Sequence, residues 1–354
     1  MDDASPTRSL PTPAEVQAAR DALRHALAGL RPQVTMERDG LVLVTLEAAA
    51  APHGAPDAAP PYVLFEQAVA DGAVEVHEIG AGTVPSVAAT TKGQPVVIFA
   101  GDTITGGKQN RVINISVWLS AGKVTELPVS CLEVGRWNQG SRFAASRKVD
   151  YLLRAKMSAQ LADVALMERE RAATAPGEGH AARRSYAADQ GAVWREIADK
   201  EGRARARSST SALHDLYERE SSDGAAFLSA FPCPAGASGV AVGIGGKLVA
   251  LELFDAASTL AEQWPRLVEG AASAHADHRR AVAAGVEPAP HHRYPDEGAL
   301  GRLLGRAAAA CPDAVVGASV GEGHDIRLRG ELVRGGALVV DGHPVHVELF
   351  RVKA

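Results

Sequence analysis

The chain has 354 residues, enough for two ordinary domains or one large one. Its 46% apolar and 22% charged residues are ordinary for a globular protein, and a net charge of -5 argues against a general nucleic-acid-binding surface. Three widely spaced cysteines exclude a disulfide framework, and no apolar run approaches the roughly 20 residues that cross a bilayer. The acidic start lacks the order of a signal peptide, so we expect a cytoplasmic protein without membrane association.

The first 140 residues are predicted to be mainly antiparallel sheet. Residues 1–12 are expected to form a disordered tail, and Thr12-Pro13-Ala14-Glu15 predicts a capping box that starts a helix reaching about Leu30. Turn-forming pairs then separate strand-like stretches and predict three hairpins in a β-rich region over 33–140. The three turns lie at Asp39-Gly40, Asp71-Gly72 and Ala121-Gly122. The second hairpin would pair residues 62–69 with 73–79, and the third would pair 111–119 with 124–131.

The centre of the chain is predicted to be helical, and the last third returns to hairpins. Residues 152–221 have helical spacing of their apolar side chains. Residues 239–284 predict a hairpin around Gly245-Gly246 followed by two helices, 256–270 and 271–284. We therefore expect an α+β fold with mainly antiparallel sheets built from hairpins and a helical central segment. Residues 13–285 would form its main domain, and residues 286–354 a C-terminal extension of one helix and one hairpin.

Two hexapeptides, 249–254 and 345–350, align without gaps although they lie 96 residues apart. Both follow a Gly-containing turn and share the pattern Val-x-x-Glu-Leu-Phe. The likeness can record a duplicated sheet element, or only the common pattern of buried hairpins.

Standard catalytic motifs are missing from the sequence. Residues 101–109 resemble a phosphate loop, but Lys108 comes one residue late and Gln109 stands where a magnesium-binding hydroxyl is required. The histidines lack the spacing of a zinc motif, and no Gly-x-Ser-x-Gly sequence is present. We therefore predict no metal site, and the sequence indicates no particular cofactor.

The polar stretch that begins at Gly106 and continues to Trp137 is unusual for a strand and its turn. Strand alternation would place Asn110, Asn114 and Ser116 on one face. A two-residue turn at Ala121-Gly122 would set Asn110 opposite Glu133, Asn114 opposite Val129 and Cys131 opposite Val112. Amides, cations and one carboxylate on one surface suit a ligand with hydroxyl and phosphate groups.

From this pattern Glu133 is the candidate general base, if the protein catalyses a reaction. The candidate ligand-binding residues are Lys108, Gln109, Asn110, Arg111, Asn114, Ser116, Arg136 and Trp137. A structural interpretation is equally open: Arg136 would pair with Glu133, and Trp137 would belong to the core. Cys131 is a weak candidate nucleophile, because a buried thiol is usually inert.

The same stretch resembles a bacterial and archaeal family named for its association with ADP-ribosylglycohydrolase and rhodanese-phosphatase genes. The resemblance lies in Gly107-Lys108-Gln109-Asn110-Arg111, in Asn114 and Ser116, and in residues 127–137. Ser209-Thr210-Ser211-Ala212 and the hairpin over 243–255 are also similar, so the likeness covers roughly residues 30 to 285. The resemblance implies a role in NAD-derived or ADP-ribose metabolism, inferred from neighbouring genes, and brings no catalytic residues with it.

Three functions follow from these observations. The first is binding or processing of a nucleotide-like ligand of NAD or ADP-ribose metabolism, with residues 108–137 as the site. The second is a non-enzymatic scaffold or protein-interaction module. The third is a metal-dependent hydrolase that would assemble Asp102, Glu133 and His77 from separate elements. No nucleic-acid partner is expected, and the sequence does not define the oligomeric state.

Overall fold

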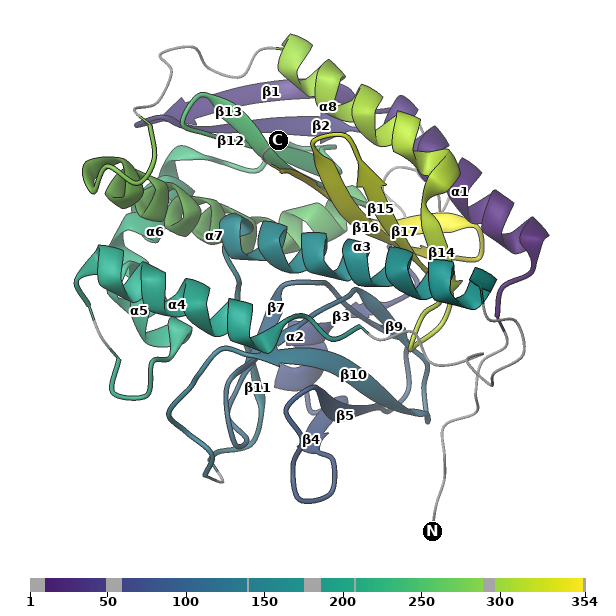
Figure 1. The fold of residues 1–354 in the computed structure, drawn as a ribbon, viewed down its shortest axis with the longest axis horizontal. Helices are drawn as coiled ribbons and strands as arrows, with labels where there is room; N and C mark the ends of the chain where they lie inside the picture. Colours follow the sequence, from purple (N-terminus) through teal and green to yellow (C-terminus); the bar gives the residue numbers. More distant parts are fainter. Residues whose placement is uncertain are drawn as a thin grey trace.

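The computed structural model describes residues 10–48, 59–138, 140–174, 186–206, 208–288 and 297–352. Its centre is an antiparallel sheet with the strand order β1-β2-β12-β13-β17-β16-β15-β14 (Figure 1). These strands are β1 (Arg31–Arg38), β2 (Leu41–Glu47), β12 (Gly239–Ile244), β13 (Lys247–Phe254), β14 (Val315–Ala318), β15 (His324–Gly330), β16 (Val333–Val340) and β17 (His343–Arg351). The hairpins predicted at Asp39-Gly40 and Gly245-Gly246 are confirmed. The hairpin expected in the C-terminal extension is also present, with its turn at Asp341-Gly342.

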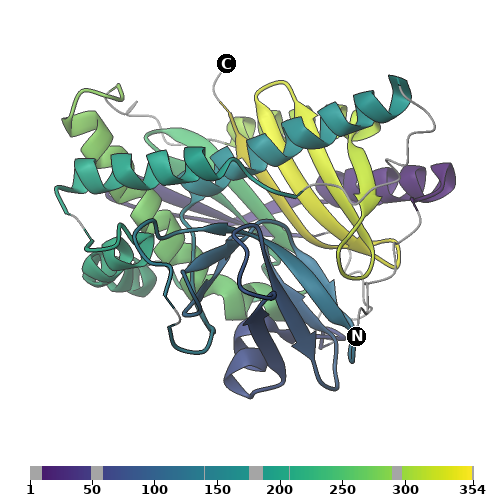
Figure 2. The ribbon, with the colours of Figure 1, turned by 60° about the horizontal axis from the view of Figure 1, so that its bottom comes forward.

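Both faces of this central sheet are buried. Val42 and Val44 of β2 pack with helices α1 (Pro13–Ala28) and α8 (Glu297–Ala310). Leu41 and Leu43, which alternate with them, pack on the opposite face with α7 (Ala257–Ala283). Helix α3 (Tyr151–Thr174) crosses the C-terminal strands on that second face (Figure 2). The capping box predicted at the start of α1 is present, with Thr12 as the N-cap residue.

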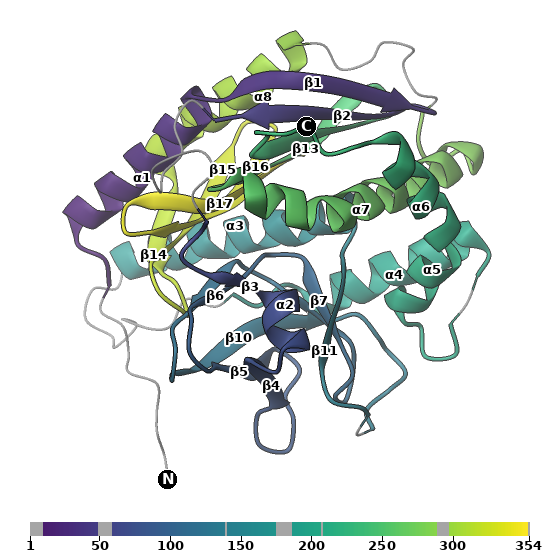
Figure 3. The same cartoon turned by 180° about the vertical axis from the view of Figure 1, so that it is seen from behind.

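The central sheet has a palindromic order. One half contains α1 followed by β1, β2, β12 and β13, and the other contains α8 followed by β14, β15, β16 and β17. The two halves meet where β13 pairs with β17, and helices α1 and α8 lie against the same face (Figure 3). This arrangement favours duplication of a helix-plus-four-strand unit, with the residues between β2 and β12 inserted into the first copy.

The residues between β2 and β12 form two smaller sheets and several helices. One sheet has the order β11-β7-β8-β10-β5-β4, and the other the order β3-β6-β9. The strands are β3 (Val63–Leu64), β4 (Val74–Glu78), β5 (Ser86–Thr91), β6 (Val96–Ile98), β7 (Asp102–Thr105), β8 (Arg111–Ile113), β9 (Val117–Leu119), β10 (Val124–Cys131) and β11 (Ala144–Lys148). The helices besides α3 are α2 (Phe65–Ala70), α4 (Gln190–Ala204), α5 (Leu213–Arg219) and α6 (Ser221–Ala230).

The first strand of the second predicted hairpin, residues 62–69, does not form as predicted. Residues Phe65–Ala70 form helix α2, in which Phe65 and Ala68 are buried on one face. Strand β4 instead pairs with β5. Glu66, Gln67 and the alanines favour helix, and tertiary burial of Phe65 outweighs the short-range hairpin signal at Asp71-Gly72.

The third predicted hairpin is correct only in part: residues 111–113 pair with 129–131, one residue away from the predicted register, but residues 117–119 do not pair with this strand. Strand β9 pairs with β6, whereas β10 pairs with β5 and β8. The turn at Ala121-Gly122 therefore connects two different sheets, and the observed register sets Cys131 opposite Arg111 and Ser130 opposite Val112. The chain leaves the strand at Asn114 and Ser116, whose side chains bond to interior groups instead of alternating on one surface.

Two further differences concern the last third of the chain. The two helices expected over 256–284 form one helix, α7, which continues through Pro265 and Gly270. The expected break at Gly270 is absent because a glycine costs a helix only about 1 kcal/mol. Residues 297–352 contain η1 (Cys311–Asp313) and four strands in addition to α8, where one helix and one hairpin were expected.

The domain boundary at residue 285 stays a prediction, while β13 and β17 belong to one sheet. The tail predicted over 1–12 lies mostly outside the described residues.

The described helices include none that combines the length and apolar character needed to span a membrane.

Candidate functional site

Several loops of the inserted region meet around Trp137. We call this the Trp137 loop cluster; it comprises residues 78–83, 106–111, 132–138, 140–143 and 208–212. The backbone N–H of Gly107 donates to Ser141 O at 2.9 Å, and the Gly140 N–H donates to Gly107 O at 2.9 Å. The Gly135 N–H donates to Thr210 O at 2.8 Å. Backbone contacts therefore fix the loops to one another.

Glycine is required where these loops cross. Gly106 has a φ of +107°, and a Cβ atom there would lie 2.5 Å from the carbonyl oxygen of Arg142. A Cβ atom on Gly135 would lie 3.0 Å from Thr210 Cα. The first position combines a left-handed backbone with a contact that no side chain could occupy. The glycines thus allow the close approach on which the cluster depends.

Glu133 is the central anion of the cluster. Arg136 Nε donates to both carboxylate oxygens, at 3.0 and 2.9 Å, and Thr210 Oγ1 donates to Oε1 at 2.7 Å. The Asn110 N–H donates to Oε2 at 3.2 Å. Burial raises the pKa of Glu133, but the hydrogen bonds from Arg136, Thr210 and Asn110 outweigh it, so the pKa lies below its usual value. Glu133 is therefore an ionised anchor in which both oxygens already have partners.

The side chains of Asn110 and Gln109 are also engaged within the cluster. Asn110 Oδ1 accepts from the Gly106 N–H at 3.1 Å and from Arg136 Nη2 at 3.1 Å. Gln109 Nε2 donates to the carbonyl oxygen of Glu133 at 2.8 Å. These amides hold the loops in place, and the expected proximity of Asn110 and Glu133 is observed despite the shifted register.

Trp137 is the aromatic side chain that the cluster exposes, with 43% of its surface accessible. Lys108 Nζ lies 5.2 Å from its ring centre, and the Arg111 guanidinium lies 5.7 Å from it. Lys108 Nζ also donates to the carbonyl oxygen of Ala81. The exposure excludes the interpretation of Trp137 as a core residue, and the two cations place positive charge beside an aromatic surface.

Arg111 lies under this surface and is fully buried. Its Nη1 donates to Gln109 Oε1 at 3.3 Å, and its Nη2 lies 3.7 Å from Glu78 Oε1. The Nε atom of Arg111 has no hydrogen-bond partner within the described part of the chain. Arg111 supports the cluster from below, whereas Lys108 and Arg136 are the cations nearer to the surface.

Two of the predicted ligand-binding residues lie elsewhere. Asn114 Nδ2 donates to the carbonyl oxygen of Tyr186 at 2.8 Å, and Ser130 donates to Asn114 Oδ1 at 2.9 Å. Ser116 Oγ is 2.8 Å from His346 Nδ1, in the interior between the inserted region and the central sheet. The structure therefore brings seven predicted residues together and separates two from them. The seven are Lys108, Gln109, Asn110, Arg111, Glu133, Arg136 and Trp137.

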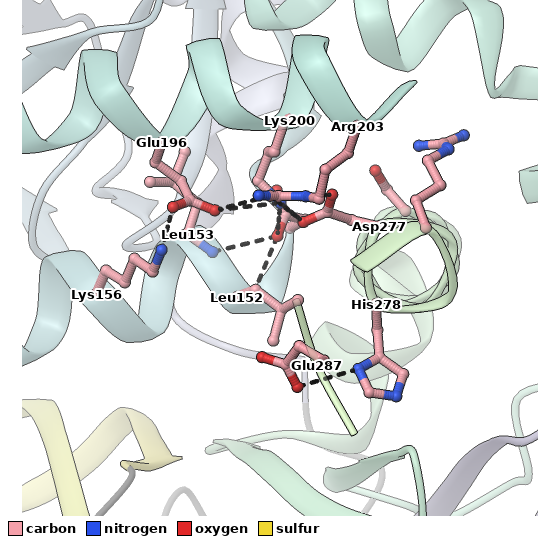
Figure 4. A network of polar contacts seen from close by, with 12 residues as sticks. Leu152, Leu153, Lys156, Glu196, Lys200, Arg203, Asp277, His278 and Glu287 are labelled. Atoms are coloured by element: carbon pink, nitrogen blue, oxygen red, sulfur yellow. Dashed lines mark hydrogen bonds and ion pairs between the residues drawn. The ribbon is translucent and has the colours of Figure 1, made fainter. Parts of the chain in front are cut away.

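Helix α4 fixes the strand that leads into the cluster. Gln190 Oε1 accepts from the Cys131 N–H at 2.7 Å, and Gln190 Nε2 donates to Cys131 O at 2.9 Å. Figure 4 shows how α4 is itself held: Lys200 Nζ and both donating atoms of Arg203 converge on Asp277 of α7, at 2.7 to 2.8 Å. This buried ion network stabilises the position of α4 and, through Gln190, the end of β10.

The other candidates from the sequence, the nucleophile Cys131 and the residues of the metal-dependent alternative, lie in environments that do not favour those roles. Burial raises the pKa of the Cys131 thiol to about 11, which leaves it protonated and unreactive at neutral pH. Asp102 pairs with Lys148 at 3.1 Å, and Glu133 pairs with Arg136. Among the described residues, no group of three or more His, Cys, Asp or Glu side chains is placed to hold a metal ion.

Sequence reasoning missed three residues that hold the cluster and the strand leading into it. Thr210, Glu78 and Gln190 bond to Glu133, Arg111 and Cys131 from segments distant in the sequence. A signal existed for Thr210, since it lies in the Ser209–Ala212 stretch that resembles the family. Nothing comparable marks Glu78 or Gln190, whose roles arise from long-range packing.

Comparison with known proteins gives one result. The model of the ARG and Rhodanese-Phosphatase-superfamily-associated Protein domain matches residues 30–350. The match includes the whole Trp137 loop cluster and continues through the C-terminal strands. No curated protein and no solved structure matches the chain significantly.

Proposed function

The chain belongs to the ARG and Rhodanese-Phosphatase-superfamily-associated Protein family, and on that premise we propose that it binds a nucleotide-like ligand of ADP-ribose metabolism. The proposed site is the Trp137 loop cluster. The name of the family supports an ADP-ribose context, and the chemistry of the cluster supports a ligand that combines a planar base with phosphates.

The observation that carries the proposal is the half-exposed Trp137 ring with cations beside it. Stacking of a base on an aromatic side chain contributes about 1–3 kcal/mol, and the aromatic surface accepts any base. Lys108 Nζ lies over the ring, 5.2 Å from its centre, so an anion attached to a base stacked on Trp137 would be within its reach. An anion would replace the carbonyl oxygen of Ala81 as the partner of Lys108, which makes Lys108 the proposed phosphate contact.

The environment of Glu133 favours binding over acid–base catalysis at this site. Its lowered pKa makes it a weak base, and its oxygens accept hydrogen bonds from Arg136, Thr210 and the Asn110 N–H. The role of Glu133 as a general base stays a prediction. In the proposed function it orients Arg136 and the loop that carries Trp137.

Isothermal titration with ADP-ribose and AMP at low salt tests the proposal. We expect Trp137→Ala to weaken binding by about 5- to 150-fold, the equivalent of about 1–3 kcal/mol. The matched control is Val134→Ala, because Val134 is 46% exposed on the same loop but is not aromatic. Lys108→Met should also weaken binding and reduce its dependence on salt concentration.

Two results would overturn the proposal. One is the absence of saturable binding of either nucleotide by the folded protein, and the other is an equal effect of the Trp137 and Val134 substitutions. The second candidate function, a protein-interaction module, is favoured by a specific observation: Val134 and Trp137, on one loop, are both large apolar side chains with more than 40% of their surface exposed. In that case both substitutions would weaken capture of a protein partner.

A further inference from the structure

A second constellation of reactive groups lies in the interior, away from the Trp137 loop cluster. Ser116 Oγ is 2.8 Å from His346 Nδ1, and His346 Nε2 is 3.5 Å from Glu252 Oε2. Ser116 comes from the link between β8 and β9, His346 from β17 and Glu252 from β13. All three are buried, and Ser116 is the most accessible of them at 5%.

The protonation states of this chain of groups can be deduced from their surroundings. Burial raises the pKa of Glu252, but the charge of Arg154 outweighs it and keeps the carboxylate ionised. Burial lowers the pKa of His346. A neutral His346 that directs its Nε2–H toward Glu252 has a free lone pair on Nδ1, which then accepts the Ser116 O–H. Ser116 Oγ in turn accepts the Ala100 N–H at 3.0 Å.

This order is the one that activates a serine: a hydroxyl bonded to a neutral imidazole, and the imidazole oriented by a carboxylate. The 3.5 Å separation of His346 and Glu252 is longer than an ordinary hydrogen bond, as is common before a substrate tightens such a site. The Ala100 N–H lies where it stabilises the charge that Ser116 Oγ acquires when it departs from the acyl carbon in the second step.

The walls of the site are aromatic. The rings of Phe99 and Phe254 lie 4.9 and 5.0 Å from the His346 ring. Trp118 lies two residues beyond Ser116 and is only partly buried, and Tyr62 packs edge-on against it at 5.3 Å. The aromatic lining of the His346 ring favours an apolar acyl group.

We propose that Ser116, His346 and Glu252 form a catalytic triad that hydrolyses small carboxylic esters with an apolar acyl group. Ser116 Oγ attacks the carbonyl carbon while its proton passes to His346 Nδ1. The ester C–O bond breaks, and the alcohol leaves with that proton. Water then attacks the acyl-serine, its proton passes to His346 Nδ1 and on to Ser116 Oγ, and the acid is released. Glu252 stabilises the imidazolium in both steps. This activity is independent of nucleotide binding at Trp137.

Labelling with diisopropyl fluorophosphate, followed by peptide mass spectrometry, tests the triad. Attack by Ser116 Oγ forms an O–P bond and releases fluoride, while His346 takes the proton. We expect one adduct, on Ser116, which Ser116→Ala abolishes. His346→Asn should slow labelling by about 10²- to 10⁴-fold, the usual contribution of a general base. Ser158→Ala is the matched control and should label like the wild type. Ser158 is equally buried, and its Oγ has no hydrogen-bond partner among the described residues.

A second measurement keeps the proposal testable if the His346 variant fails to fold. The labelling rate of the unmodified protein should rise with pH through one ionisation below pH 6.5 and then level off, because neutral His346 is the base. Folded protein that acquires no adduct on Ser116, or a rate that rises continuously into alkaline pH, would overturn the triad. The release of nitrophenolate from p-nitrophenyl acetate, lost in Ser116→Ala, would confirm ester turnover.

Discussion

Glu252 and Glu348 lie directly opposite each other on β13 and β17, and Arg154 of α3 bonds to both carboxylates. Arg154 Nη2 donates to Glu348 Oε2 at 3.0 Å. The two glutamates occupy equivalent positions in the similar hexapeptides 249–254 and 345–350. The pairing thus lies at the centre of the palindromic sheet, where two like charges would repel each other without the guanidinium between them.

Replacing Arg154 should therefore destabilise the protein strongly. Arg154→Met removes the cation that bonds to both buried carboxylates, and we expect the free energy of unfolding to fall by about 3–5 kcal/mol. Denaturation by urea measures this loss. Combining the change with Glu252→Gln and Glu348→Gln should recover part of the stability, because no buried charge is then left unpaired.

A surface ion pair provides the control for Arg154. Lys92 and Glu75 are 2.7 Å apart but have 66% and 49% of their side chains exposed. Lys92→Met should change the free energy of unfolding by less than about 1 kcal/mol. Equal effects of the Arg154 and Lys92 substitutions would contradict the importance assigned to the buried bridge.

Gly106→Ala should disturb the Trp137 loop cluster selectively. The new Cβ would lie 2.5 Å from a backbone oxygen, which cannot rotate away, and φ is +107°. We expect a loss of stability clearly larger than for Gly122→Ala, measured by urea denaturation. Gly122 also has a positive φ, +73°, but open space around the added carbon, so it isolates the backbone cost of about 1 kcal/mol. Similar losses for the two variants would show that the neighbouring loop shifts at little cost to accept the added Cβ atom.

The parts of the fold that were predictable are those specified by short-range signals. The Asp39-Gly40 and Gly245-Gly246 turns place two strands beside each other within a few residues, and Thr12 with Glu15 fixes the start of α1. The pairing of β13 with β17 depends on contacts across nearly 100 residues, shown by the 96-residue spacing of Glu252 and Glu348. No local pattern determines such a pairing, although the repeated hexapeptides indicated a relationship.

The candidate site was predictable to a similar degree. Arg136 and Glu133 are three residues apart, and their ion pair follows from that spacing. The faces assigned to Asn114 and Ser116 assumed an unbroken strand, and the chain breaks there because the two side chains bond to Tyr186 and His346. Those partners come from distant parts of the chain, so alternation along one strand could not reveal them.

Glu133→Gln should reduce stability in a pH-dependent way. The folded pKa of Glu133 lies below its ordinary value of 4.5, so its contribution is fully present above that pH and is lost as the pH falls through the folded pKa. At neutral pH we expect a loss of about 1–3 kcal/mol, because Gln cannot accept all the charged hydrogen bonds. The difference between the wild type and the variant should shrink in denaturation curves recorded below pH 4.5. A constant difference at every pH would contradict the ionised anchor.

His275 of α7 should make the protein less stable in mild acid. It is 4% exposed, and burial, aided by the charges of Arg279 and His278, lowers its pKa from 6.5 to about 4. The unfolded chain therefore takes up a proton between these two pH values and the folded chain does not, so stability falls as the pH falls through this window, by up to about 3 kcal/mol.

Urea denaturation at pH 7 and pH 4.5 measures the effect of His275. His275→Leu should flatten the slope of stability against pH, whatever its effect at neutral pH, because the variant has no proton to gain at this position. His346, whose pKa burial also lowers, contributes a slope of the same sign and is retained in the variant. His25→Gln is the control, since it also removes a histidine but His25 is exposed on α1. If the His275 and His25 variants kept the same slope, the acid sensitivity would have to arise from other groups.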